Sequence, residues 1–298
     1  MQKRDLVLMG DDIVKSAQIA EVSYDRSIIN TVLEVFEKQF SNPQASVTFR
    51  TTTKDAEKRG LNVRYVDVWS PHDPFLMATE NGLIAETGHP IDDLYPEIKA
   101  KCPIMGCGID FGAAKGFEKI WPYFPPHMPV PIENVYSITS FPDSVKNSSY
   151  FFSKFGLDKI TLAGIDYPKR STNIYFMTNS IGKFSTERVT EMINELGFRV
   201  PSSKLIALCT KAMLSYCTFT WDSPRIERLC FTILAHDPSE VPVHLHPVLE
   251  NYTLRSPVLG EKRKFIYCIT LAHNGDYIKI ENDYSSSMVD ILAAWSPN

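Results

Sequence analysis

The sequence lacks the features of membrane-spanning, secreted and nucleic-acid-binding proteins. Its longest apolar run, FIYCITLA from Phe265, is far too short to cross a bilayer. The first twelve residues, MQKRDLVLMGDD, contain no signal-peptide core. With 31 Lys and Arg against 35 Asp and Glu, the net charge is −4, so the basic excess typical of nucleic-acid binding is missing. We therefore expect a cytosolic protein with no nucleic-acid or membrane partner.

The motifs of metal and nucleotide sites are also missing. The six cysteines include no C-x-x-C pair and are expected to be buried and reduced. His244 and His246 alternate in a proline-rich loop without a third ligand, and Asp92 and Asp93 fit the first turn of a helix. His89 is expected to order its TGHP turn. Because no G-x-G-x-x-G or G-K-[ST] loop occurs, the sequence predicts neither a metal site nor a nucleotide cofactor.

No Gly/Ser linker or low-complexity tract divides the chain, so we expect residues 1–298 to form one domain. Apolar spacing predicts a helix followed by two strands, five times over, with strand pairs recurring at roughly 50–60 residues. Strands joined by short connections pair as antiparallel hairpins. Ten such strands with interposed helices predict an α+β fold, a closed antiparallel β-barrel surrounded by helices, because closure removes exposed edges. A parallel βα barrel competes, but it needs one helix for each strand.

In each repeat, the second strand carries a basic residue on or beside one face. On a single strand such charges usually face solvent, but five repeats of the pattern suggest cations that converge on one polyanion. Ammonium and guanidinium groups bind phosphate oxygens, and neighbouring aromatic rings favour a cation or an aromatic ligand. The pattern is therefore typical of an isoprenoid diphosphate site. The shared faces are Asn62 and Arg64; Lys119, Trp121 and Tyr123; Asn173, Tyr175 and Met177, with Lys169 upstream; Arg228, Cys230 and Thr232; and Tyr277, Lys279, Glu281 and Asp283.

Six segments carry a resemblance to a known family. They read NGLIAETGHPIDDL, GFEKIWPYFP, FGLDKITLAGIDYPKRSTNIYF, INELGFRVP, TWDSPRIERLCF and LGEKRKFIYCITL. From about Ser46 to the final helix, the chain resembles the ABBA-type soluble aromatic prenyltransferases of the CloQ/NphB-like group, in their metal-independent branch. The resemblance implies a ten-stranded antiparallel barrel of five ααββ units around a solvent-filled centre, in agreement with the strand count above. We expect a monomeric enzyme of secondary metabolism.

The resemblance also implies three groups of site residues. Trp121 and Tyr175 would line the prenyl chain and shield the allyl cation. The diphosphate would be bound by Lys119, Lys169, Asn173, Tyr216, Arg228 and Lys279, with Thr51 beside them. The aromatic acceptor would lie against Thr161, Leu162, Met177, Met213, Leu214, Thr232, Ile266, Glu281 and Val289.

Two departures from the family pattern concern the diphosphate. Asn62 stands where some members hold Mg²⁺ through an aspartate, and an amide lacks the charge that a hard cation prefers. Arg64, the next inward residue, stands where those members have serine, and its guanidinium would replace the charge of the metal at the diphosphate. We therefore expect no cofactor and no magnesium requirement.

The other departures concern the two substrates. Trp121 replaces a tyrosine of members that accept longer chains, which favours dimethylallyl over geranyl diphosphate. Met177 and Leu214 replace smaller polar residues and should narrow the acceptor side. Asp283 stands at the position of an aromatic wall residue, so the orientation of the acceptor stays open.

The implied reaction is electrophilic aromatic substitution. A dimethylallyl cation, kept from water between aromatic faces, would be attacked by carbon of a hydroxylated aromatic ring. Glu281 would polarise the acceptor hydroxyl or take a proton; alternatively, it forms a salt bridge with Lys279 or Arg228.

Several alternatives stay open. The chain could be a non-catalytic barrel that binds an apolar or aromatic ligand, although this leaves the convergent cations unexplained. Transfer to oxygen or nitrogen, or of a geranyl group, is also open, because regiochemistry depends on how the acceptor is placed. The acceptor could be a dihydroxynaphthalene, a dihydrophenazine carboxylate, a hydroxybenzoate or a flavonoid-like phenol.

Overall fold

A computed structural model describes residues 3–68, 72–177, 184–285 and 288–295 of the chain. In these residues eleven strands form one sheet, in the order β4-β3-β2-β1-β11-β10-β9-β8-β7-β6-β5. The strands are β1 (Ser46–Thr52), β2 (Asn62–Asp67), β3 (Gly106–Gly112), β4 (Gly116–Tyr123), β5 (Val130–Pro131), β6 (Lys159–Asp166), β7 (Ser171–Met177), β8 (Leu214–Thr220), β9 (Arg228–Ala235), β10 (Phe265–Ala272) and β11 (Gly275–Ser285).

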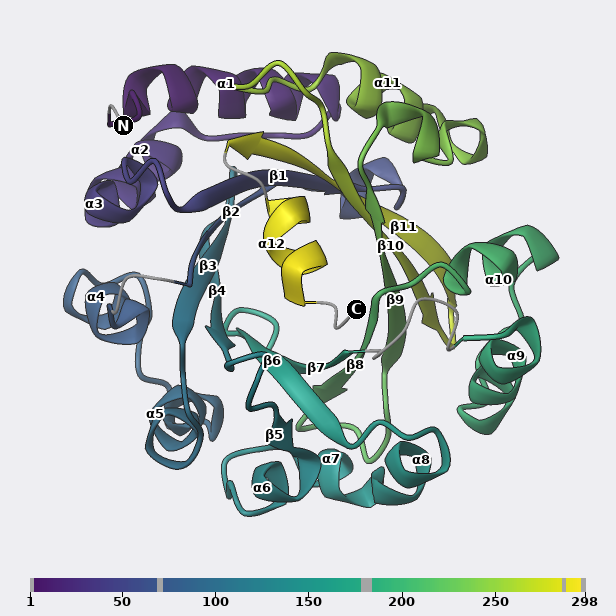
Figure 1. The fold of residues 1–298 in the computed structure, drawn as a ribbon. Coiled ribbons are helices and arrows are strands. Elements are labelled where there is room, and N and C mark those ends of the chain that lie inside the picture. Colours follow the sequence, from purple (N-terminus) through teal and green to yellow (C-terminus); the bar gives the residue numbers. More distant parts are fainter. Residues whose placement is uncertain (1–2, 69–71, 178–183, 286–287, 296–298) are drawn as a thin grey trace.

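The sheet closes on itself into a barrel. All its pairings are antiparallel, and β4 pairs with β6 through Lys119 and Asp166 and through Ile120 and Ile165. Among the described strands, only the two-residue β5 stays outside this closed ring, on the edge of β6. Figure 1 looks along the barrel, with the strands as a ring in which the early β1 lies beside the late β11. The prediction of a ten-stranded antiparallel barrel is confirmed, and the parallel alternative is wrong.

Most helices lie outside this ring (Figure 1). Several begin at an aspartate, since the carboxylates of Asp5, Asp25 and Asp73 accept hydrogen bonds from the first free N–H groups. The outer helices are α1 (Leu6–Ile19), α2 (Arg26–Val35), α3 (Glu37–Phe40), α4 (Pro74–Glu80), α5 (Ile91–Lys101), α6 (Ile132–Tyr136), α7 (Asp143–Asn147), α8 (Ser149–Lys154), α9 (Thr186–Glu195), α10 (Ser203–Cys209) and α11 (Pro247–Arg255).

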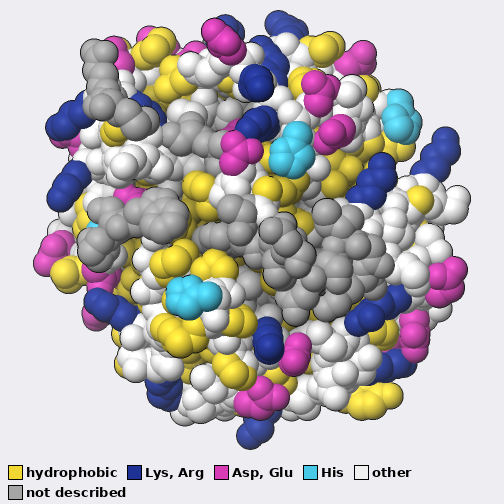
Figure 2. Space-filling model, in the orientation of Figure 1, with side chains coloured by type: hydrophobic (Ala, Val, Ile, Leu, Met, Phe, Trp, Pro, Cys, Tyr) yellow, Lys and Arg dark blue, Asp and Glu magenta, His cyan; other side chains and the backbone are white. Residues whose placement is uncertain are grey.

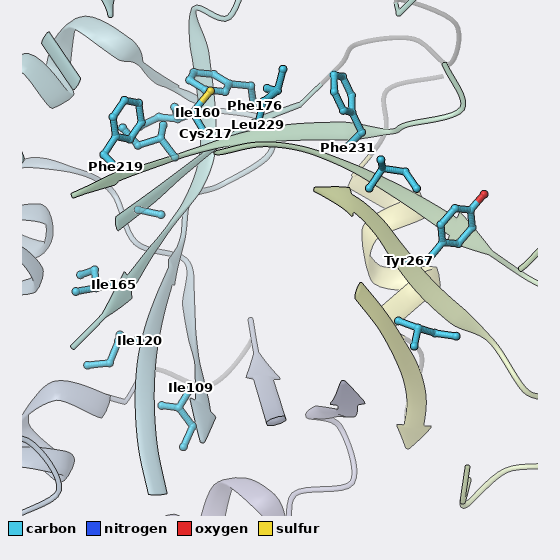
Figure 3. Packing of buried hydrophobic residues seen from close by; sticks show 14 of the residues in the cluster. Ile109, Ile120, Ile160, Ile165, Phe176, Cys217, Phe219, Leu229, Phe231 and Tyr267 are labelled. Atoms are coloured by element: carbon cyan, nitrogen blue, oxygen red, sulfur yellow. The ribbon is translucent and has the colours of Figure 1, made fainter. Parts of the chain in front are cut away.

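The two faces of each strand carry different side chains, because successive residues point to opposite sides. Outward residues such as Ile109, Ile120 and Ile165 join the helices in the main hydrophobic core, part of which Figure 3 shows. Inward residues form a second, smaller cluster that includes Trp121 and Tyr175. The core that stabilises the fold is therefore the layer between barrel and helices, which leaves the barrel interior for a site.

The last helix, α12 (Met288–Trp295), lies inside the ring in Figure 1. The Asp283 carboxylate accepts hydrogen bonds from the backbone N–H of Met288 and of Val289, both at 3.0 Å. Met288 and Leu292 pack in the inner cluster. The helix therefore covers one end of the barrel interior. On the face shown in Figure 2, charged side chains of both signs lie around the periphery.

Two local elements differ from those predicted from the sequence. SVKNSSYFFSKFG forms α7 and α8 instead of one helix, with Ser148 at the break, its hydroxyl donating to the Ser144 carbonyl. The short strand β5 was not predicted. No helix in the described part of the chain is both long and apolar enough to span a bilayer.

Candidate active site

The barrel interior holds two adjoining chambers. The polar chamber, about 680 Å³, has cationic walls of Arg50, Lys54, Lys58, Lys119, Lys169, Arg228 and Lys279. The apolar chamber, about 530 Å³, is lined mainly by Tyr123, Leu162, Leu214, Ile266, Met288 and Leu292. The chambers share Arg50, Trp121, Tyr175, Tyr216 and Lys279.

The cations of the polar chamber come from many strands, and some have carboxylate partners nearby. Lys119 Nζ on β4 lies 2.9 Å from Asp166 Oδ2, and Lys169 Nζ in the β6–β7 turn lies 3.2 Å from the same oxygen. Burial would raise the pKa of Asp166, but Lys119 and Lys169 outweigh it and hold this pKa below its ordinary value. Asp166 therefore neutralises part of the charge at this wall.

Three other cations have no carboxylate within 4.0 Å among the described residues: Lys54, Arg228 and Lys279. Arg228 Nε is buried and has no hydrogen-bond partner in that part of the chain. Burial lowers the pKa of Lys54, and the charges of Arg228 and Lys279 lower it further. These three residues are partly buried, and cations that repel one another in such surroundings are unfavourable without a counter-charge. This wall of the chamber therefore suits an anion.

Two tyrosine hydroxyl groups accompany these cations. Lys279 Nζ donates to Tyr216 Oη, and Lys54 Nζ lies 4.3 Å from the centre of the Tyr277 ring. Burial would raise the pKa of Tyr277, but Lys279, Arg228 and Lys54 outweigh it and hold this pKa below its ordinary value. Both phenols could donate hydrogen bonds to an anion in the chamber.

A buried ion-pair network lies beside the apolar chamber. Asp110 on β3 has a fully buried side chain that contacts Arg64 Nε at 2.6 Å and Arg50 Nη2 at 2.8 Å. Glu281 Oε1 on β11 accepts hydrogen bonds from Thr48 Oγ1 at 2.7 Å and from Arg64 Nη1 at 3.3 Å. Burial would lower the pKa of Arg64, but Asp110 and Glu281 outweigh it and raise this pKa well above its ordinary value. The two guanidinium groups and two carboxylates balance in charge.

Aromatic faces stand where the chambers meet. The Tyr175 and Tyr216 rings stack with centroids 4.3 Å apart, and Trp121 meets Tyr175 edge-on at 5.3 Å. The Arg64 guanidinium lies 4.3 Å from the centre of the Trp121 ring. Such faces attract a cation through their quadrupole. The junction therefore combines an anion-binding wall with a surface that stabilises positive charge.

Most residues predicted for the diphosphate line the polar chamber: Lys119, Lys169, Asn173, Tyr216, Arg228 and Lys279. Two do not. Thr51 lies on the outward face of β1, where its hydroxyl donates to the Gly60 carbonyl, so its neighbours Arg50 and Thr52 face the chamber instead. Arg64 points inward as predicted, but Asp110 and Glu281 hold it at the apolar chamber, away from the lining of the polar one.

Most residues predicted for catalysis and for the acceptor line a chamber or pack around it, and two do not. Glu281 lines the apolar chamber, and Trp121 and Tyr175 line both. Of the acceptor residues, four line the apolar chamber, namely Leu162, Leu214, Thr232 and Ile266. Three others pack in the inner cluster around it, namely Met177, Met213 and Val289.

Thr161 and Asp283 are placed differently from the prediction. The pairing of β6 with β7 shifts between Ile160 and Leu162, so Thr161 is the additional residue of a bulge and does not line the apolar chamber. Asp283 caps α12 with both carboxylate oxygens instead of forming an acceptor wall. Burial raises the pKa of this carboxyl to about 7.

Sequence reasoning missed several residues of the site. Arg50, Thr52 and Lys54 share one face of the chain around β1, and a strand alternation that included Arg50 would have found them. Asp110 gave no local signal, because its partners lie on other strands. Cys268 and the α12 residues Met288 and Leu292 were also not predicted for the apolar chamber.

The motifs that were set aside behave as ordinary structural features. His89 Nδ1 accepts from Ile91 N, and the Asp92 carboxylate accepts from Thr87 N in front of α5. His246 Nδ1 accepts from Val248 N at the start of α11. All six cysteines are buried, as predicted. In the described ranges, no group of three or more His, Cys, Asp or Glu side chains is arranged to hold a metal ion.

With this geometry in place, the similarity to known proteins decides the family. The model of the family described as aromatic prenyltransferase Orf2 matches residues 5–296. The chain belongs to this family. This aromatic prenyltransferase is similar to flaviolin linalyltransferase of Streptomyces virginiae. The two sequences are 30% identical over 281 residues, which covers 94% of this chain and 92% of the relative. It is also 30% identical over 291 residues to the furaquinocin biosynthesis prenyltransferase of Streptomyces sp. (strain KO-3988), covering 97% and 94%.

A third relative is 5,10-dihydrophenazine-1-carboxylate 9-dimethylallyltransferase of Streptomyces anulatus, 28% identical over 281 residues, with 94% of this chain and 93% of the relative covered. Among solved structures, 5-dimethylallyl tryptophan synthase from Streptomyces coelicolor, in complex with DMASPP and Trp, matches with a TM-score of 0.61 at 10% identity. That match covers 97% of this chain and 96% of the other, and it shows that the two prenyltransferases share the barrel fold.

Proposed function

We propose that this prenyltransferase transfers a dimethylallyl group from dimethylallyl diphosphate to a ring carbon of a hydroxylated aromatic molecule and releases diphosphate. The observation that carries this proposal is the wall of Lys54, Arg228 and Lys279, cations without a carboxylate partner in the described residues, beside an aromatic-lined apolar chamber. The polar chamber would bind the diphosphate, and the apolar chamber would hold the prenyl group and the acceptor.

The first chemical step is cleavage of the bond between the allylic carbon and the diphosphate oxygen. Both electrons of this bond leave with the diphosphate, so negative charge develops on the leaving group beside Arg228, Lys279 and Lys54. Fixed cations and phenol donors stabilise that charge without having to reorganise. The allyl cation that remains would lie against the faces of Trp121 and Tyr175. The apolar chamber would keep water from quenching it.

In the second step, a ring carbon of the acceptor attacks the cation, and a proton then leaves this carbon to restore aromaticity. Glu281 is the carboxylate that lines the apolar chamber, held by Thr48 and Arg64. Its remaining lone pairs could accept a hydrogen bond from the acceptor hydroxyl, which increases electron density in the ring, or accept the leaving proton. The predicted salt bridge of Glu281 exists, but its partner is Arg64 and not Lys279 or Arg228.

We also propose that the reaction needs no magnesium. Asn62 lines the polar chamber, and its side-chain N–H donates to Glu118 Oε2 at 2.7 Å, so the amide oxygen is its only possible metal ligand. The cations of the chamber supply the positive charge that a metal would bring to the diphosphate. This assignment replaces the predicted role of Arg64, whose charge is compensated by Asp110 and Glu281.

The preference for a dimethylallyl group rests on Trp121. Its indole is 1% exposed and stands between the chambers, where it limits the space for a longer chain. The names of two relatives describe different prenyl groups, since one is a dimethylallyltransferase and the other a linalyltransferase. The acceptors in these names, a dihydrophenazine carboxylate and flaviolin, are polycyclic aromatics. We propose an acceptor of this size class.

The proposal is tested by incubating the protein with dimethylallyl diphosphate and a panel of hydroxynaphthalenes, phenazines and hydroxybenzoates, followed by mass spectrometry. We expect at least one acceptor to gain a single dimethylallyl unit, with release of diphosphate in equal amount. Binding of an acceptor without any product, under conditions where both substrates saturate, would favour the non-catalytic barrel. Fragmentation of the product distinguishes transfer to carbon from transfer to oxygen or nitrogen.

A further inference from the structure

Gly164 lies on the inner wall of the barrel, in direct contact with Trp121. A Cβ atom added at Gly164 would lie 2.8 Å from Cζ3 of the indole, 3.0 Å from Cε3 and 3.2 Å from Cη2. Contacts this short are repulsive, so any larger residue at position 164 would displace the ring. The outer edge of the indole can therefore pack against β6 because Gly164 has no side chain.

The indole has little freedom to move elsewhere. Its other surroundings include the Arg64 guanidinium, 4.3 Å from the ring centre, and Tyr175, whose centroid lies 5.3 Å away. Arg64 is in turn held by Asp110, at 2.6 Å from its Nε, and by Glu281. A ring pushed away from Gly164 must therefore move into the chamber space or disturb a buried ion pair.

We propose that Gly164 is a positioning residue that sets the width of the prenyl pocket and the tilt of its aromatic wall through Trp121. This inference rests on the proposed function, since it assigns the prenyl group to the space beside this indole. Gly164 lets the ring lie close against the barrel wall, which leaves the chamber space beside the indole for the prenyl group. The pair of Gly164 and Trp121 then decides how long a prenyl chain fits.

Substitution of Gly164 by alanine should therefore impair the use of the prenyl diphosphate donor and leave the binding of the aromatic acceptor nearly unchanged. In Gly164→Ala the displaced ring narrows the pocket and tilts its face. We expect kcat/KM for dimethylallyl diphosphate to fall about 10- to 100-fold, the scale of misplacing a reacting group by about 1 Å. Any residual geranyl transfer should fall further, and KM for the acceptor should change by less than about threefold.

The decisive comparison is a double-mutant cycle with Trp121→Phe. The phenyl ring lacks the outer edge that meets Gly164, and the Trp121 N–H has no hydrogen-bond partner among the described residues, so no hydrogen bond is lost. In the Trp121→Phe background, Gly164→Ala should change kcat/KM for dimethylallyl diphosphate by less than about threefold. Gly260→Ala is the matched control, because a Cβ there meets nothing within 4 Å.

A second readout needs no substrate. The melting temperature should fall by about 2–6 °C for Gly164→Ala in the wild-type background and by much less in the Trp121→Phe background. If Gly164→Ala alone does not fold, recovery of folding in the double variant supports the contact. Equal losses in both backgrounds, or failure of both to fold, would overturn the inference.

The two readouts separate this inference from the proposed function. A wild-type protein that transfers no prenyl group would contradict the proposed function, whatever the melting temperatures. An active wild type in which Gly164→Ala leaves the ratio of kcat/KM for dimethylallyl and geranyl diphosphate unchanged would overturn the role of Gly164 alone.

Discussion

The Arg64 guanidinium is bound through its Nε to the fully buried carboxylate of Asp110, at 2.6 Å. The two residues lie directly opposite each other on β2 and β3. Arg64 also contacts Glu281 and covers one face of Trp121. Two carboxylates thus hold this arginine at the apolar chamber, whereas the cations without carboxylate partners in the described ranges lie at the polar chamber.

Removing the charge of Asp110 should destabilise the protein strongly. Asp110→Asn leaves Arg50 and Arg64 buried with one compensating carboxylate, Glu281, in contact with Arg64 only. Breaking a buried ion pair from one side costs about 3–5 kcal/mol, and we expect a decrease of that size in the free energy of unfolding. Urea denaturation measures it. As a control, Asp11→Asn removes the exposed pair with Arg26 and should cost less than about 1 kcal/mol. Similar values for both variants would contradict the assigned role of Asp110.

The two arginines Arg64 and Arg228 should differ in their effect on diphosphate binding. Arg228→Gln removes a cation of the polar chamber and should weaken the binding of inorganic diphosphate about 10- to 100-fold, the value of a charge-assisted hydrogen bond. Arg64→Gln should change this affinity by less than about threefold, because Arg64 lines the apolar chamber only. Titration calorimetry without acceptor measures both. A comparable loss of diphosphate affinity in the two variants would contradict this assignment and indicate that Arg64 also binds the diphosphate.

Glu281 should affect turnover and not the binding of the donor. Glu281→Ala removes the carboxylate that faces the acceptor, and we expect kcat to fall about 10²- to 10⁴-fold with diphosphate affinity nearly intact. Glu281→Gln is the matched control, since its amide oxygen can still accept from Thr48 and Arg64. If the amide variant keeps full activity, Glu281 only positions its neighbours, and an unchanged kcat in the Ala variant removes it from the mechanism.

Asp283 should make stability depend on pH. Burial raises the pKa of this carboxyl to about 7 in the folded protein, against about 3.9 in an unfolded chain. The folded state therefore binds the proton more tightly, so this contribution to stability is complete below about pH 4 and is lost as the pH rises through about 7. Asp283→Asn cannot ionise. Its melting temperature relative to wild type should therefore be higher at about pH 8 than at about pH 5. A difference that does not change with pH would contradict the raised pKa.

The barrel could be predicted from the sequence, because the alternation of apolar residues marks both the strands and their faces. The same alternation found Lys119, Asn173, Arg228 and Lys279 on the inner wall. The family resemblance placed Thr51 beside the diphosphate residues, but in the structure its neighbours Arg50 and Thr52 line the polar chamber, because adjacent residues of a strand face opposite sides.

The partners of the inward residues could not be read from local sequence. Asp110 is 46 residues from Arg64, and Glu281 is 217 residues from it, so only the closed sheet brings the three together. The bulge at Thr161 and the cap at Asp283 depend on tertiary context in the same way. The inward direction of Arg64 could therefore be predicted from the strand alternation, whereas its contacts with Asp110 and Glu281 could not.

The most direct test is one reaction that contains equal concentrations of dimethylallyl and geranyl diphosphate, a dihydroxynaphthalene acceptor and excess EDTA, with products identified by mass spectrometry. We expect a product that carries one dimethylallyl group and forms without magnesium. The reasons are that cations replace a metal at the diphosphate and that the indole of Trp121 limits the length of the prenyl pocket. A mainly geranylated product, or a dimethylallylated product that appears only after magnesium is restored, would contradict this mechanism.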